Sequence, residues 1–134
     1  MPRTILLVDD DKDLLCNLEA VLRKNGYETV QAHSAAEGLR TALAVRPDLI
    51  VLDVSMETDT AGFEFFNQIR SRREGSRYAS VQGVPIVLLT AIHQVTNSRF
   101  SLDDRNGFLP GIEAVFTKPV GVEALLAKVR ELVP

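Results

Sequence analysis

The stretch Asp48-Leu-Ile-Val-Leu-Asp53 carries four consecutive large apolar residues directly into a carboxylate. An alternating pattern would indicate a strand with one wet face, whereas an unbroken apolar run is typical of a parallel strand covered on both faces. We therefore predict a central strand at 49–53, with Asp53 where the strand leaves the core. Taken alone, an aspartate in this place is equally well explained as the start of a turn.

Apolar runs of this kind alternate along the chain with segments whose apolar residues recur at helical spacing. Further strands are predicted at 4–8, 27–32, 85–90 and 114–117. Helices are predicted after each strand, from residues 12, 35, 62, 95 and 122 onward. Asp11 and Ser34 stand where the first two helices begin, and both are residue types that cap helices.

Five strands that alternate with helices predict an α/β fold, because such chains form a mostly parallel sheet with helices on both faces. Right-handed crossovers leave few topologies, and we expect the strand order 2-1-3-4-5. The predicted fold class is a doubly wound, five-stranded, flavodoxin-like three-layer sandwich. Residues 1–134 are expected to form a single domain with no linker.

The composition excludes several classes of function. Of the residues, 46% are hydrophobic and 25% are charged, as in globular proteins, and the net charge of −3 argues against nucleic-acid binding by this domain. No apolar stretch is long enough to span a membrane, and we expect no membrane association. The single cysteine, Cys16, cannot form an internal disulfide, so a cytoplasmic location is expected.

Five polar residues are expected at one edge of the sheet, because ligands of such sheets bind beyond the carboxyl ends of the strands. They are Asp9, Asp10, Asp53, Thr90 and Lys118. Converging carboxylates repel one another, so a cation must join them, and oxygen ligands without histidine or cysteine favour Mg²⁺. With a lysine and a hydroxyl added, the set suits phosphoryl transfer, where positioning and charge neutralisation do most of the catalysis.

Four motifs in this order resemble the receiver domain of bacterial response regulators, over essentially the whole chain. They are Leu7-Val8-Asp9-Asp10-Asp11, Leu52-Asp53, Leu89-Thr90-Ala91 and Thr117-Lys118-Pro119. Each motif is weak alone, but all four at successive strand ends form a specific pattern. The chemotaxis member of that family has the strand order expected here, so the topology rests partly on the resemblance.

The resemblance implies a role for each of these residues. Asp53 becomes the phosphoacceptor, supplied by a histidine kinase or a histidine phosphotransfer protein. Asp10, Asp53 and the backbone carbonyl of Ser55 would bind Mg²⁺, with Asp9 acting largely through water. Lys118 would neutralise the phosphoryl group, Thr90 would hydrogen-bond to it, and Ala91 would leave room for it. An output partner that the sequence does not identify is also implied, with a homodimer as a further option.

The chain departs from the family pattern in three places. Glu57 stands where the family has proline, and Gly62 falls one residue late. Val115 stands where the family has its switch aromatic, and the neighbouring Phe116 should point to the opposite face. The segment 92–111 is longer than expected, and it includes His93, which is more simply explained as a solvent-facing residue than as a site residue.

These departures keep two rival functions open beside the phosphoacceptor. One is a receiver-fold interaction module that works without phosphorylation, which Val115 and Glu57 favour. The other is a Mg²⁺-dependent phosphohydrolase with Asp53 as nucleophile, for which the sequence offers no cap domain and no second general acid. The leading hypothesis is a signalling domain that catalyses its own phosphorylation and dephosphorylation and does not turn over an external substrate.

Overall fold

Five parallel strands form the sheet of this computed structural model, which describes residues 3–53, 65, 68–69, 83–90, 112–118 and 120–133. The strand order is β2-β1-β3-β4-β5, which confirms the predicted topology. The strands are β1 (Thr4–Val8), β2 (Glu28–Ala32), β3 (Leu49–Asp53), β4 (Ile86–Thr90) and β5 (Ile112–Thr117). The last strand begins two residues earlier than the sequence pattern predicted.

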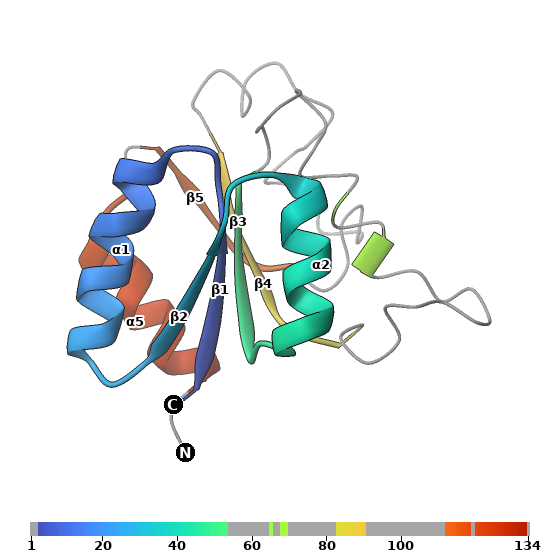
Figure 1. Ribbon diagram of the computed structural model, residues 1–134. Coiled ribbons are helices and arrows are strands. Elements are labelled where there is room, and N and C mark those ends of the chain that lie inside the picture. The colour runs from blue at the N-terminus through green and yellow to red at the C-terminus, as the bar shows by residue number, and fades with distance from the viewer. Residues whose placement is uncertain are drawn as a thin grey trace.

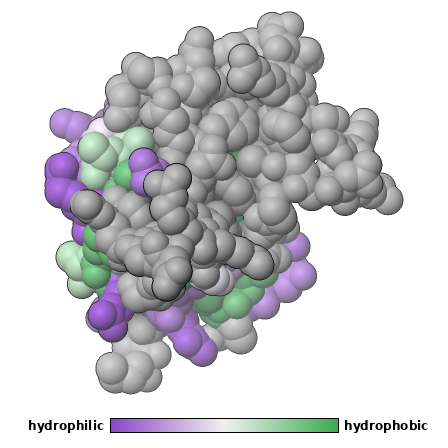
Figure 2. Space-filling view, turned by 90° about the vertical axis from the view of Figure 1, so that its right-hand side faces the viewer, coloured by the Kyte–Doolittle hydropathy of each residue, from purple (hydrophilic) through white to green (hydrophobic). Residues whose placement is uncertain are grey.

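Helices cover both faces of the sheet, as the three-layer prediction requires. Figure 1 shows α1 (Lys12–Lys24) and α5 (Val122–Leu132) side by side on one face and α2 (Ala35–Val45) on the other. No helix in the described ranges is long and apolar enough to cross a membrane. Among the described residues visible in Figure 2, hydrophobic ones lie in separate areas between hydrophilic ones.

The unbroken apolar runs are explained by the two cores on either side of the sheet. Within β3, Leu49 and Val51 pack with α1 and α5, whereas Ile50 and Leu52 pack with α2. Every residue of β3 and β4 is buried. Because successive side chains of a strand point to opposite faces, a strand covered on both faces needs apolar residues at every position.

Both described helices that follow β1 and β2 begin at the capping residues that the sequence indicated. The Asp11 carboxylate accepts a hydrogen bond from the Leu14 N–H, and the Ser34 hydroxyl accepts one from the Glu37 N–H. Gly26, with φ of 92°, turns the chain out of α1 toward β2. The two caps begin the helices directly after β1 and β2, and the turn at Gly26 leads the chain back into the sheet at β2.

Phe65 is a core residue that the sequence analysis missed. Its side chain is fully buried in the same cluster as Ile69 and the α2 residues Ala35 and Ala42. The sequence pattern instead predicted Phe63 and Phe66 with Ile69 on the apolar face. Phe63, Phe66 and the helix predicted at 95–105 lie outside the described residues.

Candidate functional site

The carboxyl ends of four neighbouring strands bring the predicted site residues to one edge of the sheet. Val8 pairs with Leu52, Asp53 with Leu89, and Thr90 with Thr117, so the strands end at the same level. Asp9 and Lys118 directly follow β1 and β5. The parallel register is therefore what gathers residues that are far apart in the chain.

Three carboxylates meet at this edge. Asp9, Asp10 and Asp53 each have an oxygen within 4.8 Å of one another. Asp9 and Asp53 are buried, at 0% and 3% exposure, whereas Asp10 is exposed. The structure thus brings together all three predicted carboxylate ligands, with Asp10 on the solvent side.

Lys118 supplies the cation of this cluster. Its Nζ lies 3.0 Å from Asp9 Oδ2 and 3.4 Å from Asp53 Oδ2, and its side chain is 25% exposed. Burial disfavours the charged ammonium, but the contacts with Asp9 and Asp53 outweigh burial and raise the pKa of Lys118 above its usual value. Lys118 is therefore held as a cation between the two buried carboxylates.

The pKa of Asp10 is raised above its ordinary value. Burial, the charge of Asp9 and a side-chain hydrogen bond with Asp9 raise the pKa of Asp10, and Lys118 offsets only part of this rise. Three carboxylates share the one ammonium of Lys118 among the described residues of this edge. A bound cation would remove this repulsion.

One buried oxygen, Asp9 Oδ2, indicates that a hard cation would fit this site. Asp9 Oδ1 accepts a hydrogen bond from the Asp11 N–H at 3.0 Å, but Asp9 Oδ2 has no hydrogen-bond partner in the described part of the chain. The ammonium of Lys118 lies 3.0 Å from Oδ2 and forms an ion pair with it. Carboxylate oxygens arranged in this way suit Mg²⁺, which binds a few protein oxygens and retains its waters.

Thr90 lies at the same edge and is buried. Its backbone carbonyl accepts a hydrogen bond from the Lys118 N–H at 2.8 Å, which fixes the end of β5 against the end of β4.

The hydrogen bond from the Asp11 N–H to the Asp9 carboxylate was not predicted from the sequence. Three consecutive aspartates were the available signal, because the second residue after a carboxylate commonly donates its amide back to it.

Val115 and Phe116 of β5, three and two residues before Lys118, point to opposite faces of the sheet, as predicted. Val115 packs with the α2 cluster and Phe116 with the α1 and α5 cluster. Ala91, Ser55, Glu57, Gly62 and His93 lie outside the described residues. Their predicted places at the site, or outside it, are therefore not tested by the structure.

Comparison with known proteins gives a consistent set of relatives. A family model described as the response regulator receiver domain matches residues 5–130. The transcriptional regulatory protein PrrA of Mycobacterium tuberculosis is 36% identical over 129 residues, which cover 96% of this chain and 48% of that protein. The chain spans about half the length of the curated relatives it matches.

Solved structures agree with this match. A CheY-like response regulator receiver domain protein from Methanospirillum hungatei superposes with a TM-score of 0.74 at 27% identity, covering 98% of this chain and 93% of that one. The chemotaxis protein CheY4 of Vibrio cholerae gives a TM-score of 0.77 at 25% identity, covering 99% of this chain and 100% of that one. These similarities extend over the whole sheet and its helices.

Proposed function

Because the chain belongs to the family of response regulator receiver domains, we propose that Asp53 accepts a phosphoryl group and that its phosphorylation changes partner binding. Receiver domains are signalling domains of two-component systems. For this chain we propose Asp53 as the acceptor, phosphoryl transfer as the chemistry, and a change of partner binding as the result. It also places residues 1–134 in one domain.

The chemistry is a transfer of one phosphoryl group. A carboxylate oxygen of Asp53 attacks the phosphorus of a phosphohistidine on a kinase or phosphotransfer protein. The P–N bond breaks with its electron pair going to nitrogen, and the ring, already protonated on its other nitrogen, leaves as neutral imidazole. Lys118 neutralises charge on the transferred group, and Thr90 and Ala91 at the end of β4 would bind and accommodate it. Asp10, Asp53 and the Ser55 carbonyl would hold Mg²⁺, with Asp9 acting largely through water, and the ion would supply positive charge for the phosphoryl oxygens.

The observation that carries the proposal is the position of the Lys118 ammonium. It contacts both Asp53 and Asp9, which come from two different strands, so it is already placed where negative charge would be added to Asp53. Because such preorganised charges need little rearrangement during reaction, they stabilise the transition state efficiently. A lysine that only formed an ion pair with one surface carboxylate would not need to lie between two buried carboxylates.

The test is phosphorylation by a small phosphodonor. Incubation with acetyl phosphate and Mg²⁺ is expected to add the mass of one phosphoryl group to the wild-type chain. Asp53→Ala should remove this gain, and chelation of Mg²⁺ by EDTA should suppress it. Asp13→Ala, an exposed carboxylate of α1, is the matched control and should leave the gain unchanged. No gain in the wild type, or an undiminished gain in Asp53→Ala, would contradict the proposal.

Partners and location belong to the proposal as well. A histidine kinase or histidine phosphotransfer protein would be the donor, in the cytoplasm. PrrA is named a transcriptional regulatory protein, so a DNA-binding output segment outside the matched region is the partner we favour. Nucleic-acid contact by residues 1–134 themselves is not part of the proposal, because their net charge is negative.

Val115 supports one alternative function. It packs in the core cluster with α2, and Phe116 faces away from it, so the family's switch aromatic has no counterpart at either position. A module that binds its partner without phosphorylation would fit this arrangement. In that case, Asp53→Ala would bind the partner as tightly as the wild type does.

A further inference from the structure

The outer edge of β2 is an edge of the sheet that a side chain of α1 partly covers. β2 is the terminal strand of the sheet, and no strand in the described ranges pairs with its outer side. The Glu28 N–H donates to the Arg3 carbonyl, and the Asp9 N–H donates to the Ala32 carbonyl. Alternate residues of β2 thus bond to β1, and the backbone groups of Thr29 and Gln31 point outward.

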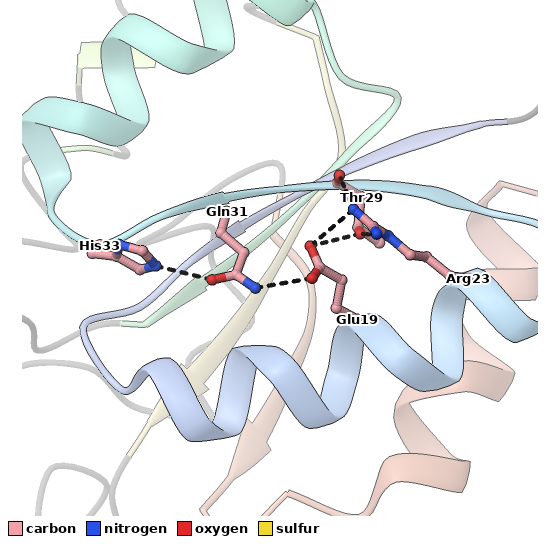
Figure 3. A network of polar contacts seen from close by, with 5 residues as sticks. All are labelled: Glu19, Arg23, Thr29, Gln31 and His33. Atoms are coloured by element: carbon pink, nitrogen blue, oxygen red, sulfur yellow. Dashed lines mark hydrogen bonds and ion pairs between the residues drawn. The ribbon is translucent and has the colours of Figure 1, made fainter.

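Arg23 of α1 reaches this outward-facing backbone. Its Nε donates to the Thr29 hydroxyl at 2.8 Å, and its Nη2 donates to the Thr29 carbonyl at 3.4 Å (Figure 3). The carbonyl is one of the groups that a strand added to this edge would use. Arg23 therefore occupies a pairing position of the edge strand.

Glu19 fixes the guanidinium in this position. Its Oε2 accepts from the Thr29 hydroxyl at 2.8 Å and from Arg23 at 3.4 Å, and its Oε1 accepts from the Gln31 amide at 3.0 Å. Because the Gln31 nitrogen faces a carboxylate, its oxygen faces His33, whose Nε2 donates to it at 2.9 Å. The chain of contacts in Figure 3 holds the side chains along β2 in one orientation.

The network is poorly explained as a source of stability alone. The Arg23 side chain is 60% exposed and the Glu19 side chain 19%, and an ion pair with one partner this open to solvent contributes little to folding. Open strand edges, by contrast, recruit strands from other chains unless charged side chains or other devices block them. An arginine held on the outward Thr29 carbonyl places a charge at the edge and also occupies an acceptor that an incoming strand would need.

We propose that Arg23, positioned by Glu19 and Thr29, shields the outer edge of β2 against pairing with a strand of a second copy of this chain. The protected surface is the backbone of Thr29 and Gln31. Without the guanidinium, two copies would pair through their β2 edges. This role is independent of phosphorylation of Asp53.

Sedimentation velocity over a range of protein concentrations tests the proposal. Arg23→Ala is expected to self-associate at a concentration about tenfold lower than the wild type, the factor that corresponds to one hydrogen bond to a charged group. Lys24→Ala is the matched control, since it removes the same charge from the same end of α1 and should sediment as the wild type does. Circular dichroism checks that each variant is folded.

A second pair of variants separates edge pairing from unfolding. Gln31 directs its N–H outward, so Gln31→Pro removes an edge donor without breaking the ladder to β1. Adding Gln31→Pro to Arg23→Ala should restore the monomer, whereas adding Gln31→Ala should not. If Arg23→Ala does not fold, Arg23→Met replaces it, because methionine keeps a long apolar stem but has no charge and no donor for the Thr29 carbonyl.

Two results would overturn the proposal. The first is a folded Arg23→Ala chain that sediments as the wild type does at every concentration. The second is self-association that persists unchanged when Gln31→Pro is added, because association would then use another surface.

Discussion

The ammonium of Lys118 lies 3.4 Å from the Asp53 carboxylate, although β5 and β3, whose ends carry them, are separated in the sheet by β4. The same ammonium contacts Asp9 after β1. One cation thus links the ends of three strands, and two of the three groups are almost fully buried. Substitutions at this point should therefore affect stability as well as chemistry.

Lys118→Met should lower the free energy of unfolding in metal-free buffer by about 3 kcal/mol, because it leaves two buried carboxylates without their cation. Urea unfolding measures this change. Lys128→Met, which removes the Lys128–Glu131 ion pair on the surface of α5, is the control and should cost less than about 1 kcal/mol. Equal losses of unfolding free energy in the two variants would show that the Lys118 contacts stabilise the fold no more than a surface ion pair does.

Asp10→Asn should raise the melting temperature in EDTA at neutral pH. The raised pKa of Asp10 means that the folded chain holds this proton more tightly than the unfolded chain, so metal-free stability falls as pH rises through the pKa. Asparagine does not titrate, so Asp10→Asn should avoid this loss, and its melting temperature should depend less on pH. Melting curves between pH 4 and about 7 would measure both effects.

Addition of Mg²⁺ should make the wild-type chain melt at a higher temperature than Asp10→Asn, the reverse of the order expected in EDTA. Wild-type chain gains stability from a ligand that binds only the folded state, whereas Asp10→Asn lacks one of the three carboxylates and should gain much less. Melting curves with increasing MgCl₂ measure the difference, with CaCl₂ as a comparison for cation size. An equal gain in both proteins would argue against Asp10 as a ligand.

Gly38→Ala should destabilise the chain by about 1–2 kcal/mol, although alanine favours helices. A Cβ at this position of α2 would lie 2.8 Å from Phe65 Cε2 and 3.0 Å from Val8 Cγ1. Both neighbours are buried, so neither has room to move. Chemical denaturation gives the change, and Phe65→Leu in the Gly38→Ala background should recover part of it. Additive losses would contradict this contact.

Tyr27→Phe should cost about 1–2 kcal/mol, because the Tyr27 hydroxyl donates a buried hydrogen bond to the Val133 carbonyl at 3.0 Å. The bond ties the start of β2 to the end of α5. Urea unfolding monitored by far-UV circular dichroism measures the loss. Tyr27→Leu is the companion variant and should cost more, because it also removes buried ring surface.

Sequence patterns were most informative where one periodicity dominates. The apolar runs predicted as strands at 4–8, 49–53 and 85–90 became β1, β3 and β4, with β4 beginning one residue later, and Asp11 and Ser34 became caps at the predicted positions. Phe65 was missed because three phenylalanines within four positions allow several helical faces, and only packing against α2 selects one. The early start of β5 at Ile112 is likewise decided by pairing with β4, where the register shifts between Ile86 and Val87.

The sequence alone determined the class of fold and the identity of the polar residues at the carboxyl ends of the strands, because alternation of strands and helices restricts the connections that a parallel sheet can use. The strand order was predicted from the same restriction together with the resemblance to receiver domains. Tertiary structure decided which groups touch. The contact of Lys118 with both Asp9 and Asp53, the exposure of Asp10, and the reach of Arg23 to the edge of β2 depend on side-chain packing across strands. Such distances are set by long-range contacts that no local pattern encodes.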